Sequence, residues 1–239
     1  MKVFKNEFSW SRSRVEMFHE CRRKYYHHYY GAWGGWDETA DERTRRTHVL
    51  KKLMNRRRWA AHIVQNCIAD ILRDVREGGF HKGAEEVVEA AVALMRADFR
   101  NSREGGYWRN PKSAGLIEHE YDIPVADSDW RKNAEHVRNC LRGFLASDLF
   151  QRTKTLGPEQ MPEIGKFDYF ELEGRRIFAR PDLCVREGEG IALHVFKTGK
   201  ADEEDVRRQL AGSALFIAAK WNAAEPLLHQ LPDCILRRA

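Results

Sequence analysis

Lys197 is the first residue whose type and position suggest chemistry. It ends the segment Ile191-Ala-Leu-His-Val-Phe-Lys197, an apolar run followed by Thr198-Gly199. This pattern predicts a buried strand over 191–197 that carries one ammonium group to its tip. A lysine in that place usually has an acid two residues away on the same face of the strand. Here that position is Val195, so the sequence leaves open where such an acid would come from.

Three more side chains are candidates for the same site. Asp182 ends the stretch "ARPD" at 179–182, Gln209 lies in "RRQL" at 207–210, and His62 lies on a predicted helix. Each candidate also has an ordinary structural explanation. His62 could be a satisfied core histidine, and Asp182 and Lys197 could simply end strands. Gln209 could be a solvated helix residue.

The elements that must position these side chains follow from periodicity and breakers. We expect helices at 9–30, with Ser13 and Glu16 as a capping box, and at 38–76, 84–100, 127–150 and 202–221. We expect strands at 116–125, 167–172, 175–185, 191–197 and 227–236, with a tight turn at Glu173-Gly174. Glycine-rich or polar segments at 31–37 and 101–115 predict loops.

This order predicts one α/β domain over residues 1–239. Its helical N-terminal part would cover about 1–115 and its strand-rich core about 116–239. We expect a small mixed central sheet of about four or five strands, flanked by helices.

Composition limits the class of protein. The formal net charge is +5 and the isoelectric point is near 9.0, which suits a nucleic-acid partner without requiring one. Five dispersed cysteines without a Cys-x-x-Cys pair argue against a zinc ribbon and a disulfide framework, and they suit a reducing compartment. The N-terminus lacks an apolar signal core, and no apolar run is long enough for a membrane span. We therefore expect a soluble, cytoplasmic protein without membrane partners.

The stretches "ARPD", "FKTGK" at 196–200 and "RRQL", in this order, resemble the PD-(D/E)XK nuclease superfamily. The closest likeness is to its RecB-like branch, which includes the CRISPR-associated RecB-like exonucleases. "SWSRSRVEMFHECRRKYYHHYYG" at 9–31 is similar to the opening helix of that branch, with Arg22 in place of a proline. "WAAHIVQNCIADIL" at 59–72 resembles its histidine-bearing helix.

The resemblance implies a restriction-endonuclease-like core and metal-dependent DNA cleavage. His62 and Asp182 would hold Mg²⁺ or Mn²⁺, Lys197 would assist the attacking water, and Gln209 would support the site. Two positions depart from the family pattern. Val195 replaces the acid of the acid-x-lysine motif, and Ser213 replaces a tyrosine.

The missing acid could be supplied from elsewhere. Glu163 and Glu118 are possible sources, and His194 would need a β-bulge to turn toward the site. The branch also has iron–sulfur members, but Cys234 is the sole cysteine near the C-terminus, so we expect no cluster and interpret Cys21 as a core residue.

We therefore expect a nucleic-acid-binding protein whose ancestral deoxyribonuclease activity is weakened or lost. Its partner would be single-stranded DNA or duplex ends, with a protein partner in a DNA-processing or defence complex as a further possibility. The alternatives are an active Mg²⁺- or Mn²⁺-dependent nuclease with a migrated acid, and a non-catalytic interaction scaffold on the same fold.

Surface residues allow two interpretations each. Trp33 and Trp36 could stack on unpaired bases, but we expect them to pack against the domain. Many basic side chains lie in the N-terminal part of the sequence. They could bind along a phosphate backbone, or they could belong to solvated helix faces. They are Arg12, Arg14, Arg22, Arg23, Lys24, Arg43, Arg45, Arg46, Arg56, Arg57 and Arg58.

Overall fold

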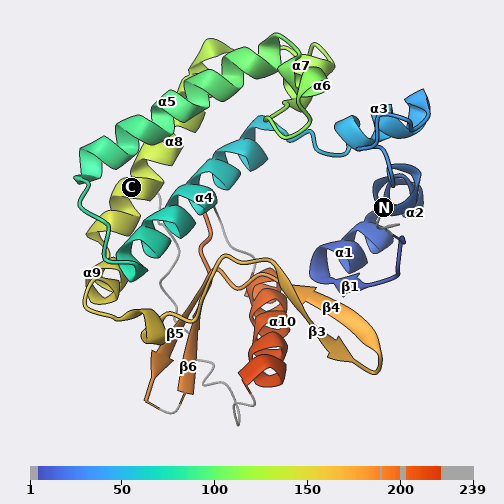
Figure 1. The fold of residues 1–239 in the computed structure, drawn as a ribbon. Helices are drawn as coiled ribbons and strands as arrows, with labels where there is room; N and C mark the ends of the chain where they lie inside the picture. Colours follow the sequence, from blue (N-terminus) through green and yellow to red (C-terminus); the bar gives the residue numbers. More distant parts are fainter. Residues whose placement is uncertain (1–4, 189, 200–202, 222–239) are drawn as a thin grey trace.

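A computed structural model describes residues 5–188, 190–199 and 203–221, and it shows a mixed α/β protein (Figure 1). The predicted strand at 227–236 lies outside these residues. The helices are α1 (Arg12–Glu20), α2 (Arg22–Tyr26), α3 (Glu42–Leu50), α4 (Arg56–Arg76), α5 (Ala84–Arg103), α6 (Gly106–Arg109), α7 (Ile117–Glu120), α8 (Asp127–Ala146), α9 (Asp148–Thr153) and α10 (Glu203–Trp221). A π-helical turn, His27–Gly31, follows α2, and a 3₁₀ turn covers Pro158–Gln160.

The described strands form two three-stranded sheets. One sheet has the order β1-β4-β3, with β1 (Trp10–Ser11) parallel to β4 (Arg175–Ala179) and β3 (Asp168–Leu172) antiparallel to it. The other has the order β2-β5-β6, formed by β2 (Glu163–Ile164), β5 (Leu183–Glu187) and β6 (Gly190–His194), all antiparallel. The prediction of one sheet of four or five strands is therefore wrong for the described residues.

Pro181 explains this difference. The predicted strand 175–185 is interrupted at Arg180-Pro181-Asp182, and its two halves, β4 and β5, join different sheets. Proline has no N–H group to donate to a strand ladder, so it ends the pairing of β4. The predicted strand 167–172 is confirmed as β3, and the Glu173-Gly174 turn has positive φ at both residues, +48° and +69°.

Local contacts also divide the predicted helices. The helix predicted over 9–30 is broken at Cys21, whose backbone is extended, and Ser11 rather than Ser13 caps α1. The helix predicted over 38–76 is interrupted at 51–55, where Met54 pairs with Leu116. The helix predicted over 127–150 ends at Ala146 and restarts at Asp148.

The strand predicted at 116–125 is wrong. Leu116 makes one bridge, to Met54, and its N–H group donates to Ser102 Oγ at 2.9 Å. The chain then turns into α7. Tyr121 and Ile123, which should alternate into a core, are 59% and 47% exposed. The alternating pattern predicted a strand, but apart from the bridge at Leu116 no described strand pairs with this segment.

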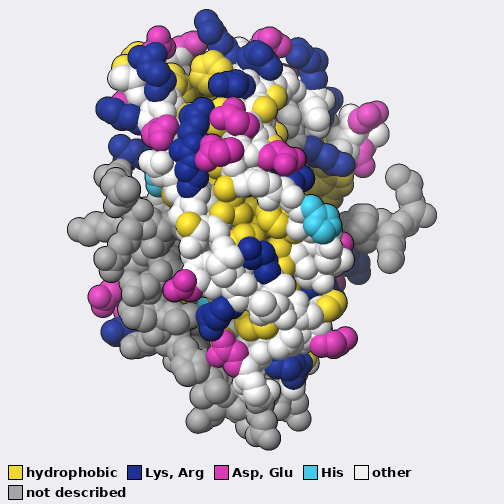
Figure 2. All heavy atoms as spheres, turned by 90° about the vertical axis from the view of Figure 1, so that its left-hand side faces the viewer, with side chains coloured by type: hydrophobic (Ala, Val, Ile, Leu, Met, Phe, Trp, Pro, Cys, Tyr) yellow, Lys and Arg dark blue, Asp and Glu magenta, His cyan; other side chains and the backbone are white. Residues whose placement is uncertain are grey.

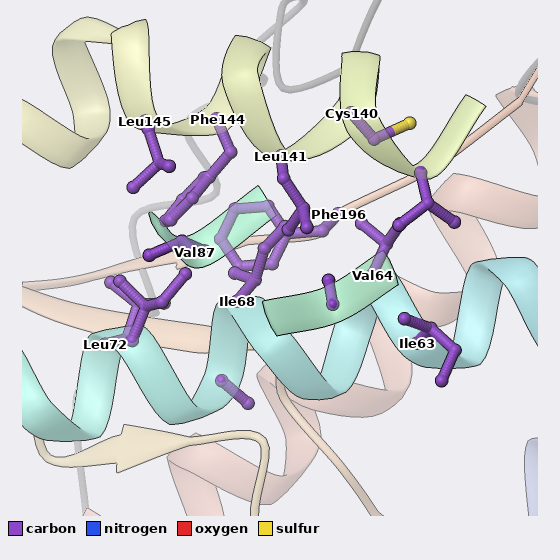
Figure 3. Close-up of a cluster of buried hydrophobic side chains, with 14 of the residues drawn as sticks. Ile63, Val64, Ile68, Leu72, Val87, Cys140, Leu141, Phe144, Leu145 and Phe196 are labelled. Carbon is purple, nitrogen blue, oxygen red and sulfur yellow. The ribbon is translucent and has the colours of Figure 1, made fainter. Parts of the chain in front are cut away.

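The main hydrophobic core lies between α4, α5 and α8 and is closed by residues of the second sheet (Figure 3). Ile68 and Leu72 of α4 point toward Leu141 and Phe144 of α8, and all four side chains are almost completely buried. Phe196 enters this cluster from the segment after β6, with its ring centroid 5.5 Å from that of Phe144.

A second core lies between α10 and both sheets. Phe216 and Ile217 of α10 contact Phe170 of β3 and Leu193 of β6. Strand β5 is buried on both faces, because Leu183 and Val185 face the main core while Cys184 faces α10. No described helix combines the length and the apolarity needed to cross a lipid bilayer.

The main core should dominate stability. We expect Leu141→Ala to lower the free energy of unfolding by about 2–5 kcal/mol, because a fully buried leucine leaves a cavity. Leu94→Ala is the matched control on α5, since Leu94 is 46% exposed, and it should cost less than about 0.5 kcal/mol. Urea denaturation measures both, and equal losses would contradict this assignment of the core.

Candidate functional site

Phe196 fixes the position of Lys197. The Phe196 side chain is buried in the main core, and its backbone N–H group donates to Asp182 Oδ2 at 2.9 Å. Strand β6 ends at His194, and the side chains of Val195 and Lys197 are both partly exposed. The buried ring therefore anchors the segment that presents the ammonium group.

Asp182 occupies the joint between β4 and β5. Its backbone carbonyl accepts a hydrogen bond from Gly165 N at 3.1 Å, which holds the joint beside β2. Burial raises the pKa of the Asp182 carboxyl group, and this outweighs the hydrogen bond from Phe196 and the nearby charges of Arg180 and Lys197, which act in the opposite direction.

Gln209, Asp205 and Arg12 complete a network around Asp182 and Lys197. Gln209 Nε2 lies 3.5 Å from Asp182 Oδ2, and Gln209 Oε1 accepts from Arg12 Nη1 at 3.2 Å. Asp205 accepts from Lys197 Nζ at 3.0 Å and also from Arg12 Nη2. We call these five side chains the site network.

Asp205 is the acid beside Lys197. Burial opposes its ionisation, but hydrogen bonds and charges from Lys197 and Arg12 hold the pKa of the Asp205 carboxyl group below its usual value. The sequence analysis did not single out Asp205 as a site residue. Asp205 and Gln209 are about one helical turn apart, so the sequence could have predicted that both side chains lie on the same face of α10.

His62 is not part of the site network. It is exposed on α4, and its Nε2 atom lies 3.0 Å from Asn66 Nδ2. Partial burial and the charges of Arg180 and Arg58 lower the pKa of His62. The structure thus brings Asp182, Lys197 and Gln209 together. His62 lies outside this group, and the charge of Arg180 acts on both His62 and Asp182.

The described side chains do not fit a resident divalent cation. Within the described residues, no group of three or more His, Cys, Asp or Glu side chains is placed to hold a metal ion. Asp182 has one amide donor from the backbone and one from Gln209, and Asp205 already binds two cationic side chains. Mg²⁺ and Mn²⁺ require several free oxygen ligands.

The three expected sources of a replacement acid have other roles. Glu163 is buried on β2 and accepts from Lys220 Nζ at 2.7 Å. Glu118 of α7 accepts from the backbone N–H group of Arg56 at 2.8 Å and so stabilises the start of α4. His194 is buried in regular pairing opposite Leu183, so no bulge turns it toward the network.

Several cationic side chains act on the titratable groups His28, His62 and Asp182. Lys24, Lys51 and Arg58 lie close enough to His28 that their charges, together with burial, lower its pKa to about 4. Arg58 and Arg180 act in the same way on His62, and Arg180 and Lys197 act on Asp182. We call Lys24, Lys51, Arg58, Arg180 and Lys197 the basic strip.

The middle of the basic strip carries uncompensated charge. Lys24 pairs with Glu20, and Lys197 pairs with Asp205. Lys51 Nζ donates to the His28 carbonyl and Arg180 Nε to the Gly165 carbonyl, and neither has a carboxylate partner among the described residues. Arg58 forms no ion pair with a carboxylate among the described residues, and its neighbour Arg56 is the residue that pairs with Asp129. Their positive charges are therefore available to an external anion.

The structure contradicts the expectation for Cys21 and bears out in part the expectation that Trp33 and Trp36 pack against the domain. These two side chains are 38% and 50% exposed, their rings meet edge to face at 5.0 Å, and Trp36 also meets His48 of α3 at 5.9 Å. Trp36 also lines a hollow of about 620 Å³ together with Trp108, which is 40% exposed. Cys21 is exposed rather than buried in a core, because its Sγ accepts from Lys24 N at the start of α2.

No protein-family model, curated protein or solved structure matches this chain. The chemistry of the site therefore has to be inferred from its own geometry.

The raised pKa of Asp182 gives a pH-dependent prediction. Above the folded-state pKa, the ionised carboxylate costs more in the folded protein than in the unfolded chain, and this cost disappears as the pH falls toward about 4. We expect Asp182→Asn to unfold with a higher free energy than the unaltered protein at about pH 7, and the difference to shrink toward about pH 4. Urea denaturation across this range measures it, and parallel pH curves would contradict it.

Proposed function

We propose that this protein binds nucleic acid on a nuclease-like fold of the PD-(D/E)XK type and cleaves it weakly or not at all. The observation that carries the proposal is the site network. A carboxylate, an ammonium group and a glutamine meet there as in that superfamily, but Val195 stands at the acid position and no metal-binding group is present among the described residues.

The basic strip supports binding of a phosphate backbone. Each of its five cations acts on His28, His62 or Asp182, and Lys51, Arg58 and Arg180 form no ion pair with a described carboxylate. Cations arranged in a row release counterions when they bind a polyanion, which makes affinity strongly dependent on salt. Exposed Trp36 and Trp108 add ring faces suited to unpaired bases.

The site network supports loss of catalysis. Lys197 is held by Asp205, and Asp205 is held in turn by Arg12, so opposite charges neutralise one another where a metal-dependent nuclease would place a cation. In this arrangement Lys197 can bind a phosphate oxygen if its ammonium group gives up the contact with Asp205. In this proposal the site network binds and orients a phosphate group and neutralises its charge. Its described side chains would not activate a water molecule for attack.

A specific observation keeps one alternative open. Asp205 is a carboxylate within 3.0 Å of the Lys197 ammonium group, so it is the described acid best placed to replace the missing one. An active nuclease with Asp205 as a migrated acid is the second candidate function.

Binding can be tested by charge reversal. We expect the protein to bind single-stranded or duplex-end DNA at low salt, and Arg58→Glu with Arg180→Glu to reduce the slope of log K against log[salt] by about two, because two phosphate contacts are lost. Fluorescence anisotropy of a labelled oligonucleotide measures this. Arg96→Glu with Arg131→Glu is the matched control, since both residues are exposed and lie outside the strip. Absence of DNA binding at low salt would favour the scaffold alternative.

Cleavage can be tested with Mn²⁺. We expect no cleavage of labelled single- or double-stranded DNA by the unaltered protein beyond that of Asp182→Ala or Lys197→Ala. Val195→Asp introduces a carboxylate two residues before Lys197, at the position where the proposed superfamily has its acid, and we expect it to create or raise Mn²⁺-dependent cleavage. Activity in the unaltered protein that is lost in Asp205→Asn would instead establish Asp205 as the migrated acid.

A further inference from the structure

A groove of about 790 Å³ lies between α5 and α8, and its lining includes none of the basic-strip residues. These helices cover the side of the molecule shown in Figure 2, where hydrophobic side chains are visible between Lys or Arg and Asp or Glu side chains. The site network does not use this groove, because the side chains of the network come from α1, α10 and the strand ends.

The floor of the groove is apolar. It contains Val92, Met95 and Phe99 of α5 and Trp130 and Ala134 of α8. Val92, Met95 and Phe99 follow helical spacing, so they form one stripe along α5. The stripe continues across to α8, where Trp130 contacts Phe99 with ring centroids 5.0 Å apart.

The rim of the groove is strongly cationic. Five basic side chains line it, Arg96, Arg100, Arg131, Lys132 and Arg138, against the single carboxylate of Glu135. Lys132 pairs with Asp129, and Arg138 lies 3.9 Å from Glu135. Arg96, Arg100 and Arg131 form no ion pair with the described residues, so three arginines from the two helices flank the apolar floor with free guanidinium groups.

We propose that this groove binds an acidic amphipathic helix of a partner protein. An apolar stripe between two cationic rims is complementary to a helix whose apolar face is flanked by carboxylates. The lining residues on α5, from 92 to 100, extend over about 12 Å, and those on α8, from 128 to 138, over about 15 Å, which matches two to three helical turns.

The aromatic side chains of the floor favour a peptide over a nucleic acid. The Trp130 ring meets Phe99 edge to face and lies 5.5 Å from His119. Trp59 is 2% exposed, and its ring N–H group donates to Asp98 at 3.0 Å. Rings packed against one another give a smooth apolar floor for aliphatic side chains, whereas base stacking requires an open ring face.

A designed peptide tests this proposal on the full-length protein. The probe is a labelled, amidated peptide of about three to four helical turns, with leucines at i, i+3, i+4 and i+7 and glutamates on both flanks. We expect saturable binding by fluorescence anisotropy, weakened at least about tenfold by Arg96→Glu with Arg131→Glu. Ala134→Trp, which fills the floor with a bulky ring, should weaken binding to a similar extent, and urea denaturation checks that the variant is folded, because Ala134 packs against the main core.

The controls separate this site from the basic strip. Arg58→Glu with Arg180→Glu carries the same change of net charge and should leave peptide binding unchanged. Equal binding of a peptide with serines in place of leucines would overturn the proposal, because the floor would then have no role. No binding of the probe, equal binding by Arg96→Glu with Arg131→Glu, or displacement of the probe by a short oligonucleotide would also overturn it.

Discussion

The candidate site depends on the double role of Phe196. Its ring is buried among the side chains of α4 and α8, and its backbone N–H group binds the Asp182 carboxylate. One residue therefore connects the hydrophobic core to the polar network. Because the ring cannot leave the core without a large loss of buried apolar surface, the segment that carries Lys197 is held in a fixed place. The joint at Pro181 sets the position of Asp182 in the same way, by ending one sheet and starting the other.

Charge balance between carboxylates and cations stabilises the site network. Carboxylates brought together at a protein site repel one another unless cations lie between them. Here Lys197 and Arg12 bind Asp205, and Gln209 bridges Arg12 to Asp182. The network also joins α1 to α10, so the N-terminal helices are attached to the sheet region by the same contacts that neutralise the site.

The two surfaces for which we propose ligands differ in their physics. The basic strip offers cations from several elements, three of them without a described carboxylate partner, which suits a polyanion whose charges are spread along a chain. The groove between α5 and α8 combines an apolar floor with arginines that have no described partner, which suits a ligand with both apolar and anionic faces. The strip and the groove use different side chains, and α4 carries neighbouring residues of both, Arg58 of the strip and Trp59 of the groove.

The sequence by itself determined the long helices α5 and α10, the turn at Glu173-Gly174 and the strand β3, because each depends on local periodicity or on backbone conformations that few residues adopt. It also led to the expectation that Asp182, Lys197 and Gln209 lie near one another, through the proposed resemblance to the PD-(D/E)XK superfamily. Only the tertiary structure decided that the strands divide into two sheets, that residues 116–125 turn instead of pairing, and that Asp205 rather than Glu163 lies beside Lys197. Pairing partners and ion pairs are contacts between distant segments, and the periodicity of one segment carries no information about which other segment will reach it.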